Sequence, residues 1–346
     1  MTIIVSRIEV FIIYFCWIPL FSLLLRHVRS MILEEDEIGK MKSVVPVIEE
    51  PNPPIWPDNV LLFRPDDEPK DILERIKVTE DEKYEYRDID HNNEMKWGYN
   101  SNRHFTKDRY ALLFAPGEYD GLDFEVGYYV QLSGLGVRAD DVVFTAHSRG
   151  PFVEALNKRE VVGGRPGLSL DTFWRIAENF KTEADEFLWA VSQAAPLRRV
   201  HVAKDLILHD AGAFASGGVL ANAIVEGNVQ FGSQQQYLSR NVNFLQKKKG
   251  IFLGAWSNVF VGCINNPNPS DGIIIAGGPS VTIDSSPQMV VEKPFVVLKE
   301  QILASDPTKF ELHVPKPRIK NNKKENGNDS TTTTSTTATN STIGPD

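Results

Sequence analysis

From Tyr110 onward, the apolar positions fall into brief runs of β-prone residues, separated by Gly, Asn, Asp or Pro. Strands this short, interrupted this often by turn residues, are typical of an all-β protein. Runs such as GIIIAG and VVFTA are apolar at both odd and even positions, which favours strands buried by neighbours. A β-sandwich, the competing all-β fold, predicts alternation along one solvated face instead.

Asparagine or arginine recurs where these runs end, at Asn179, Arg198 with Arg199, Asn222, Asn241 and Asn265. The recurrence is roughly twenty residues per step, the length of one coil of a single-stranded right-handed parallel β-helix. Each coil of that fold pairs in parallel with the coils before and after it. Asn tolerates the left-handed backbone of sharp corners and can form a ladder along the stack. We therefore predict a parallel β-helix with asparagines at its corners.

The composition divides the chain into four parts. Residues 1–30 hold an apolar run and are expected to be a signal peptide or signal anchor. Residues 31–58 are acidic and then Pro-rich, as in a linker. The β-helix is expected over 59–315, and the Ser/Thr/Asn-rich tail over 316–346 is expected to be disordered.

The apolar run Val10–Leu25 has the size of a signal-peptide core and is somewhat short for a membrane span. No small-residue cleavage site follows it, so a retained anchor and a removed peptide both stay open. We expect a secreted protein, or one held at the membrane by this segment alone. In that setting the sequons at Asn328 and Asn340 would carry sugars.

Charge and cysteine content exclude several classes of protein. The formal net charge is -9 with a pI near 5.4, which argues against nucleic-acid binding. Only Cys16 and Cys263 are present, so neither a disulfide framework nor a cysteine-based zinc cluster can form.

Several separated motifs carry a family resemblance. They are RYALLFAPGEYDGLDFEVGYYVQLSGLGVRADDVVF, FWRIAENF, LWAVSQAAPLRRVHV, ASGGVLANAIVEG, GSQQQYLSRN and VVEKPF. From Asn59 to Leu298 the chain resembles a pectin-lyase-like parallel β-helix family of bacteria and fungi, loosely labelled "coagulation factor 5/8 type domain protein" or "adenylyl cyclase". No activity is carried over from those labels. Family members usually continue with further strands, so we expect a truncated member.

By analogy of fold alone, such scaffolds are mostly polysaccharide hydrolases and lyases with a groove along one sheet. Glycoside hydrolysis needs two carboxyl groups about 5–9.5 Å apart. Acidic residues on neighbouring coils are Glu178, Asp185, Glu186, Asp210 and Glu226. We select Asp185 and Asp210 as catalytic candidates. The alternative for Asp210 is that it only closes a turn after an apolar strand.

Lyase chemistry on an acidic sugar needs a base and a cation that neutralises the carboxylate. Arg199 is the third catalytic candidate, on the expectation that it points outward on the same face as His201. The equally weighted alternative is a salt bridge between Arg199 and a neighbouring carboxylate, such as Asp210 or Glu178.

Amides and aromatic rings suit sugar hydroxyls and sugar faces. On this ground Gln235, Arg240, Trp189 and Trp256 are the predicted substrate-binding residues, although the Gln run could equally form an internal ladder. The motifs of polygalacturonases, pectate lyases, dinucleotide-binding proteins and zinc proteases are missing.

We therefore predict a carbohydrate-active protein, a polysaccharide hydrolase or lyase, with a polysaccharide as its partner. The alternative is a non-catalytic β-helix that binds glycans or surfaces. An enzyme should place two carboxyl groups in one open groove, whereas a binding module should show amides and aromatics without such a pair. No cofactor is expected, except that calcium could bind acidic turns such as Asp140 with Asp141.

Overall fold

The computed structural model describes residues 51–89, 95–155, 172–210, 213–245, 252–265, 280–284, 289–299 and 309–319. All of these except Pro51 belong to one compact unit, Asn52–Asp346. The predicted signal segment and the sequons at Asn328 and Asn340 lie outside the described residues. No helix among the described residues is long and apolar enough to cross a membrane.

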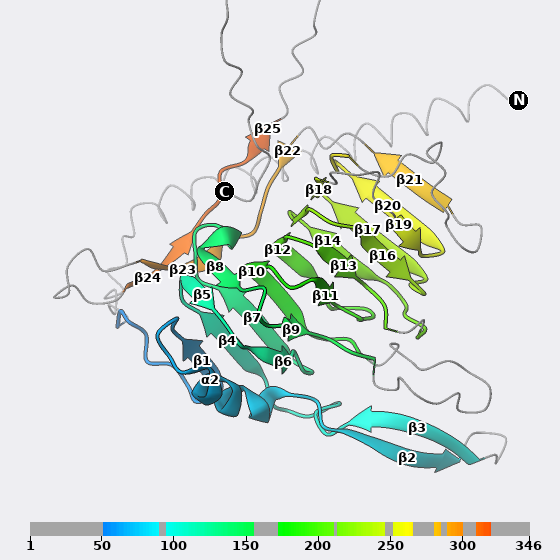
Figure 1. Cartoon of the computed structure of the whole chain (residues 1–346), viewed down its shortest axis with the longest axis horizontal. Coiled ribbons are helices and arrows are strands. Elements are labelled where there is room, and N and C mark those ends of the chain that lie inside the picture. Colours follow the sequence, from blue (N-terminus) through cyan, green and yellow to red (C-terminus); the bar gives the residue numbers. More distant parts are fainter. Residues whose placement is uncertain are drawn as a thin grey trace, which may run out of the picture. The chain divides into compact units, whose positions relative to one another are not determined.

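The described chain is a parallel β-helix, as predicted, and its coils have three faces (Figure 1). The main face is built from β1 (Val60–Phe63), β4 (Tyr110–Phe114), β7 (Val130–Gly134), the first half of β10 (Ile176–Thr182), the first half of β12 (Leu197–Val202), β14 (Gly218–Ala221), β17 (Gln236–Arg240), β20 (Ser257–Val261) and β21 (Ser280–Asp284). These strands pair in parallel and in register, so equivalent positions of successive coils form columns.

The other two faces follow the main face within each coil. The second face contains β5 (Gly117–Tyr119), β8 (Val142–Phe144), the second halves of β10 and β12, β15 (Ile224–Val225) and β18 (Asn243–Phe244). The third face contains β6 (Asp123–Glu125), β9 (Gly150–Phe152), β11 (Glu186–Leu188), β13 (Asp205–Ile207), β16 (Val229–Gly232) and β19 (Phe252–Gly254).

The corner between the main and second faces has left-handed backbone in successive coils. Its residues are Asn179 (φ 62°), Arg199 (φ 52°), Asn222 (φ 52°), Asn241 (φ 54°) and Gly262 (φ 61°). The amide Nδ2 of Asn241 donates to Oδ1 of Asn222 at 2.7 Å, so part of the predicted ladder exists. The prediction misplaces the last corner, because the register of β17 with β20 puts Gly262 beside Asn241. Asn265 is also left-handed (φ 53°) but lies three residues later.

The interior is a stack of inward-facing apolar side chains. Phe114, Phe144 and Phe180 follow one another at centroid distances of 5.1 and 5.4 Å. At the first coil, the helix α2 (Pro69–Ile76) buries Ile72 and Ile76 against this core. Packing at every coil stabilises the stack mainly through contacts with its nearest neighbours.

Other described elements flank the coils. The short helix η1 (Lys77–Thr79) and the hairpin of β2 (Lys83–Ile89) with β3 (Met95–Ser101) precede β4, and η2 (Ala139–Asp141) precedes β8. After β21 the pairing becomes antiparallel: β22 (Met289–Val290) with β25 (Arg318–Ile319), and β23 (Phe295–Lys299) with β24 (Lys309–His313). β25 lies in the segment predicted as a disordered tail.

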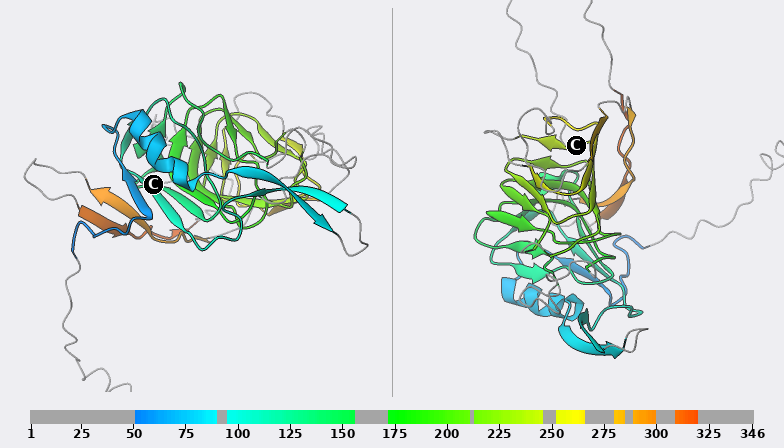
Figure 2. Two further views of the ribbon diagram at one scale, coloured as in Figure 1. Left: turned by 90° about the horizontal axis from the view of Figure 1, so that it is seen from below. Right: turned by 90° about the vertical axis from the view of Figure 1, so that its right-hand side faces the viewer.

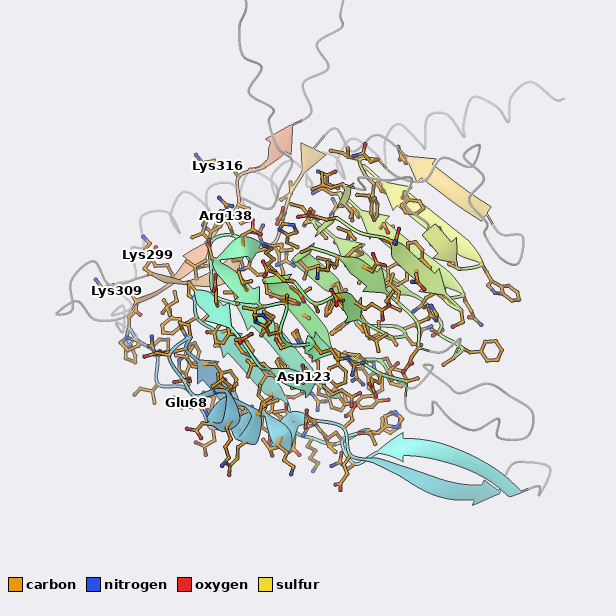
Figure 3. All side chains as sticks on the ribbon, viewed as in Figure 1. Glu68, Asp123, Arg138, Lys299, Lys309 and Lys316 are labelled. Carbon is orange, nitrogen blue, oxygen red and sulfur yellow. The ribbon has the colours of Figure 1, made fainter. Side chains whose placement is uncertain are left out.

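The β23–β24 hairpin packs beside the main face (Figure 2). The amide of Leu298 donates to the carbonyl of Leu135 at 2.8 Å, and Leu298, Leu135 and Ala115 share a small apolar cluster. Lys299 and Lys309 project outward from this hairpin (Figure 3). The hairpin therefore covers the edge of the main face nearest the asparagine corner.

Candidate functional site

Two hollows lie along the start of the main-face strands and meet at Ala194. One, of about 650 Å³, is lined by Asn59, Val60, Arg109, Tyr110, Ala111, Tyr129, Val130, Gln131, Trp174, Arg175, Ile176 and Ala194. The other, of about 400 Å³, is lined by Gln193, Ala194, Ser216, Gly217, Gly218, Val219, Gln236, Tyr237, Leu238, Ser257 and Val259. We call the two together the corner groove. Because it follows one end of the stacked strands, it runs along the β-helix axis.

One wall of the corner groove is a single column of register-matched residues. In coil order it consists of Arg109, Tyr129, Trp174, Ala194, Gly217, Gln236 and Ser257. Backbone hydrogen bonds tie its members together, including Tyr129 N to Trp174 O at 2.7 Å. Tyr129, Trp174 and Ala194 all have left-handed φ, between 55° and 58°. This repeated turn points their side chains in the same direction.

The first part of this wall is an aromatic stack. Tyr129 and Trp174 lie 5.4 Å apart with ring planes at 13°. The guanidinium of Arg109 lies 3.5 Å above the Tyr129 ring, close enough for a cation–π contact. Phe105 meets Trp174 edge to face at 5.5 Å. Trp174 is 38% exposed and Phe105 is 65% exposed, so these rings are presented to solvent.

Small residues continue the wall after Trp174. Ala194 and Gly217 occupy the next two positions of the column and leave the face of the wall open there. Gly217 has φ 118°, and a Cβ at this position would lie 2.8 Å from Gln236. Only glycine therefore suits both the backbone and the close approach of Gln236.

The second half of the groove carries amides and hydroxyls. Gln236 donates from Nε2 to the carbonyl of Ser216 at 3.1 Å. Beneath them, the buried Gln234 accepts from Gly217 N at 2.9 Å and donates to the carbonyl of Val191 at 2.8 Å. These buried hydrogen bonds hold in place the backbone that carries the exposed amide and hydroxyl groups. Gln234 itself bonds to backbone groups of earlier coils.

The lining residues of the corner groove include no aspartate or glutamate. The nearest acid along the main face is Glu178, whose side chain is only 6% exposed. It accepts hydrogen bonds from Arg198 Nε at 2.9 Å and Gln131 Nε2 at 3.2 Å, and pairs with Lys293 Nζ at 3.1 Å. With these three partners around its carboxylate, Glu178 serves as a structural ion-pair residue of the main face.

Two of the predicted substrate-binding residues lie at the rim of this groove. Gln235 and Trp256 precede Gln236 and Ser257 in neighbouring coils, and both are exposed. Arg240 lies at the far end of β17, in the outward column that also contains Glu178 and Arg198. The structure therefore brings Gln235 and Trp256 together and places Arg240 across the main face from them.

Trp189 and Arg199 do not have the expected exposure. Trp189 is fully buried and donates from Nε1 to the carbonyl of Ala195, because its ring fills the core. Arg199 occupies a left-handed corner and is 1% exposed, so it does not share the outward face of His201. It pairs with Glu292 at 2.7 Å, which matches the salt-bridge alternative with a different acid.

Asp185 and Asp210 are not brought together. Asp185 is highly exposed before β11 and pairs with Lys204. Asp210 follows the opposite end of β13 and accepts a hydrogen bond from the Ala155 amide at 3.1 Å. The length of a third-face strand separates the two positions, which does not correspond to a catalytic pair facing one bond.

His201 joins two acids from two other coils on the second face. Its Nδ1 lies 2.5 Å from Oδ1 of Asp140, and its Nε2 lies 2.8 Å from Oε1 of Glu226. Burial lowers the pKa of His201, but the hydrogen bonds to both carboxylates outweigh it and the net shift is upward. The hydrogen bond from His201 lowers the pKa of Asp140 to about 2. We call these three residues the histidine clasp.

The acidic turn considered for calcium is engaged in protein contacts. Asp140 belongs to the histidine clasp, and Asp141 accepts from the Arg138 amide at 2.8 Å. Across the part of the chain that the structure describes, no group of at least three His, Cys, Asp or Glu residues could hold a metal ion.

Sequence reasoning missed the wall residues Tyr129 and Trp174, and also Gln193, which lines the groove one position before Ala194. A usable signal was present for the two wall residues, because both stand just before a main-face strand at the same point of their coils. That point becomes visible only once the strands are placed in register.

Comparison with known proteins identifies relatives of the β-helix. No family model matches the chain. It is 36% identical over 197 residues to an exo-β-1,3-glucanase of Streptomyces sp. (strain SirexAA-E / ActE), a match covering 56% of this chain and 29% of that protein. Its structure is similar to that of sacteLam55A from Streptomyces sp. SirexAA-E, with a TM-score of 0.55, 28% identity, and coverage of 78% of this chain and 41% of that one. A variant of sacteLam55A in complex with glucose matches equally well. The chain thus spans less than half the length of either relative.

Proposed function

We propose that the corner groove binds a β-1,3-glucan, and that the chain is a carbohydrate-binding β-helix of the glucanase type. The observation that carries this proposal is the lining of the groove: solvent-exposed rings followed by amides and hydroxyls, without a carboxylate. Aromatic faces pack against the apolar C–H faces of sugars, and amides pair with their hydroxyls. The similarity to an exo-β-1,3-glucanase suggests which sugar polymer to test.

The electrostatics of the groove also favour a neutral ligand. Arg175 borders the groove, but its guanidinium is fully buried and pairs with Asp81 at 3.1 Å. Arg109 covers Tyr129 and donates to the carbonyls of Thr106 and Asp108. Neither cation is thereby directed at a ligand carboxylate, so a neutral glucan suits the groove better than a polyuronate.

Binding is tested by calorimetric titration of the full-length chain with soluble β-1,3-glucan. We expect Gln236→Ala to weaken binding about tenfold, because the amide that pairs with sugar hydroxyls is lost. Gln230→Ala, on β16 of the third face, is the matched control and should bind as the wild type does. Equal affinities of the wild type and Gln236→Ala, or tighter binding of polygalacturonate, would contradict the proposal.

Hydrolysis is a second candidate function, and it is favoured by the similarity to a glucanase. It requires a carboxyl pair that the groove lining does not contain. Reducing-end release from β-1,3-glucan by the full-length chain tests it. Activity abolished by Asp210→Asn but retained in Asp185→Asn would show that Asp210 acts with an acid other than Asp185.

A further inference from the structure

The aromatic stack of the corner groove is not explained by the core. Its rings come from residues just outside the main-face strands, and they keep solvent contact at Trp174 and Phe105. Left-handed backbone at Phe105, Tyr129 and Trp174, with φ between 57° and 61°, is uncommon for aromatic residues. Holding these rings at the surface therefore costs backbone conformational energy. We call Phe105, Tyr129 and Trp174 the aromatic platform.

The platform is continuous with the polar half of the groove. Trp174 and Gln236 belong to the same column and are separated by Ala194 and Gly217. At a strand spacing of about 4.8 Å, three steps place them about 14 Å apart along the axis. The whole column from Arg109 to Ser257 spans about 29 Å by the same spacing. A single sugar ring is too short to contact both halves.

The platform is also rigid. Arg109 closes one face of the Tyr129 ring, Trp174 closes the other, and Asn59 donates to the Arg109 carbonyl at 2.7 Å. Because ring and guanidinium are already stacked, little side-chain freedom remains to be lost when a ligand binds. Trp174 also meets Phe173 edge to face at 4.4 Å, yet it lines the groove beside Ala194 and remains 38% exposed.

We propose that the aromatic platform is a sugar-binding subsite distinct from the amide and hydroxyl subsite at Gln193, Ser216 and Gln236. This inference rests on the proposed function. It means that the groove binds a linear oligosaccharide along the β-helix axis. One sugar ring packs against Trp174, and a sugar several units along the chain pairs with Gln236. The ligand class is therefore an extended neutral oligosaccharide rather than a monosaccharide or disaccharide.

The test is a length series of β-1,3-gluco-oligosaccharides, from two to eight glucose units, titrated into the full-length chain. We expect affinity to rise about tenfold between the shortest and longest ligands in the wild type. Trp174→Ala should remove this gain, so that long and short ligands bind with similar affinity. Trp174→Phe, which keeps a ring, should restore most of it. Trp56→Ala, a ring paired with Phe310 outside the groove, is the control.

Phe105→Ala provides a second variant in case Trp174→Ala does not fold, because Phe105 is mostly exposed. We expect it to reduce the length-dependent gain in affinity. Binding that is independent of length, or a length dependence that both variants retain, would overturn the platform subsite and leave the glucan-binding proposal standing. No binding of any oligosaccharide by the wild type would overturn both.

Discussion

At the scale of single residues, the histidine clasp is the clearest set of side-chain contacts that the stacking of coils creates. Asp140, His201 and Glu226 are far apart in sequence, yet the parallel register sets both carboxylates against one imidazole ring. Both ring nitrogens can donate only when the ring is protonated, so the clasp requires the charged form of His201. Lys181 lies beside His201 on β10 but is paired with Glu183, and Arg138 is paired with Asp140.

The clasp predicts a pH-dependent stability. The pKa of His201 is raised in the folded state, so its contribution is complete below the ordinary value near 6.5 and is lost as pH rises through the folded pKa. The lowered pKa of Asp140 gives a contribution that is lost only as pH falls toward about 2. We expect His201→Gln to lower the urea midpoint more at pH 5.5 than at pH 8.5.

His147→Gln is the control for this experiment. His147 also contacts an acid, Asp120 at 3.2 Å, but its side chain is 84% exposed. Exposed pairs contribute little, so its loss should leave the urea midpoint nearly constant across the same pH range. A stability difference for His201→Gln that grows with pH would contradict the role assigned to the clasp.

At the scale of elements, the corners are the part of the fold that sequence predicts best. Left-handed backbone favours Asn and Gly for local steric reasons, so Asn179, Asn222 and Asn241 could be identified without knowledge of the register. The glycine corner at Gly262 could not, because glycines also occur in ordinary turns. The groove was harder to predict from sequence, because the residue types of its wall share no pattern.

Two exposures were mispredicted, for two different physical reasons. Side chains alternate along a strand, but the left-handed residue at a corner interrupts the alternation. Arg199 is such a residue, so it turns inward to meet Glu292 while its neighbours Arg198 and His201 stay on the outer side. Trp189 follows Phe187 by two positions and shares its inward side, so ordinary alternation along the strand buries it, whereas its residue type alone had suggested an exposed ring.

The asparagine ladder predicts an ordered series of stabilities at position 241. Asn241→Ala loses the hydrogen bond to Asn222 and places a Cβ-bearing residue in left-handed backbone, which together should cost about 2–3 kcal/mol. Asn241→Gly loses only the hydrogen bond and should cost about 1 kcal/mol. Urea unfolding of both variants checks this. A glycine variant less stable than the alanine variant would show that the corner backbone is not the limiting factor.

At the scale of the whole described unit, a segment late in the chain is tied to the middle coils by charge. Glu292 pairs with Arg199 at 2.7 Å, and both side chains are almost completely buried. Lys293 pairs with Glu178 from a half-exposed position. Phe295 lies 4.2 Å below the Arg199 guanidinium. These contacts hold the entry to β23 against the coils.

Removing one partner of the buried pair should loosen this attachment. Glu292→Gln leaves the Arg199 charge without its counterion, which should cost about 3–5 kcal/mol. Hydrogen exchange of the β23–β24 hairpin should become faster, while the interior strands of the main face keep their protection. Lys293→Gln, which removes an exposed partner, should change exchange very little. Uniformly faster exchange throughout the coils would instead show that the pair supports the whole unit.

The in-register stacking of the main face makes the β-helix a molecular ruler. Every coil adds one position to the groove wall and advances it by about 4.8 Å, whatever the sequence of the turns on the other faces. Inserting or deleting a whole coil would therefore lengthen or shorten the bound stretch of ligand in fixed increments, without rebuilding the rest. An insertion confined to a turn would leave the spacing of the wall positions unchanged.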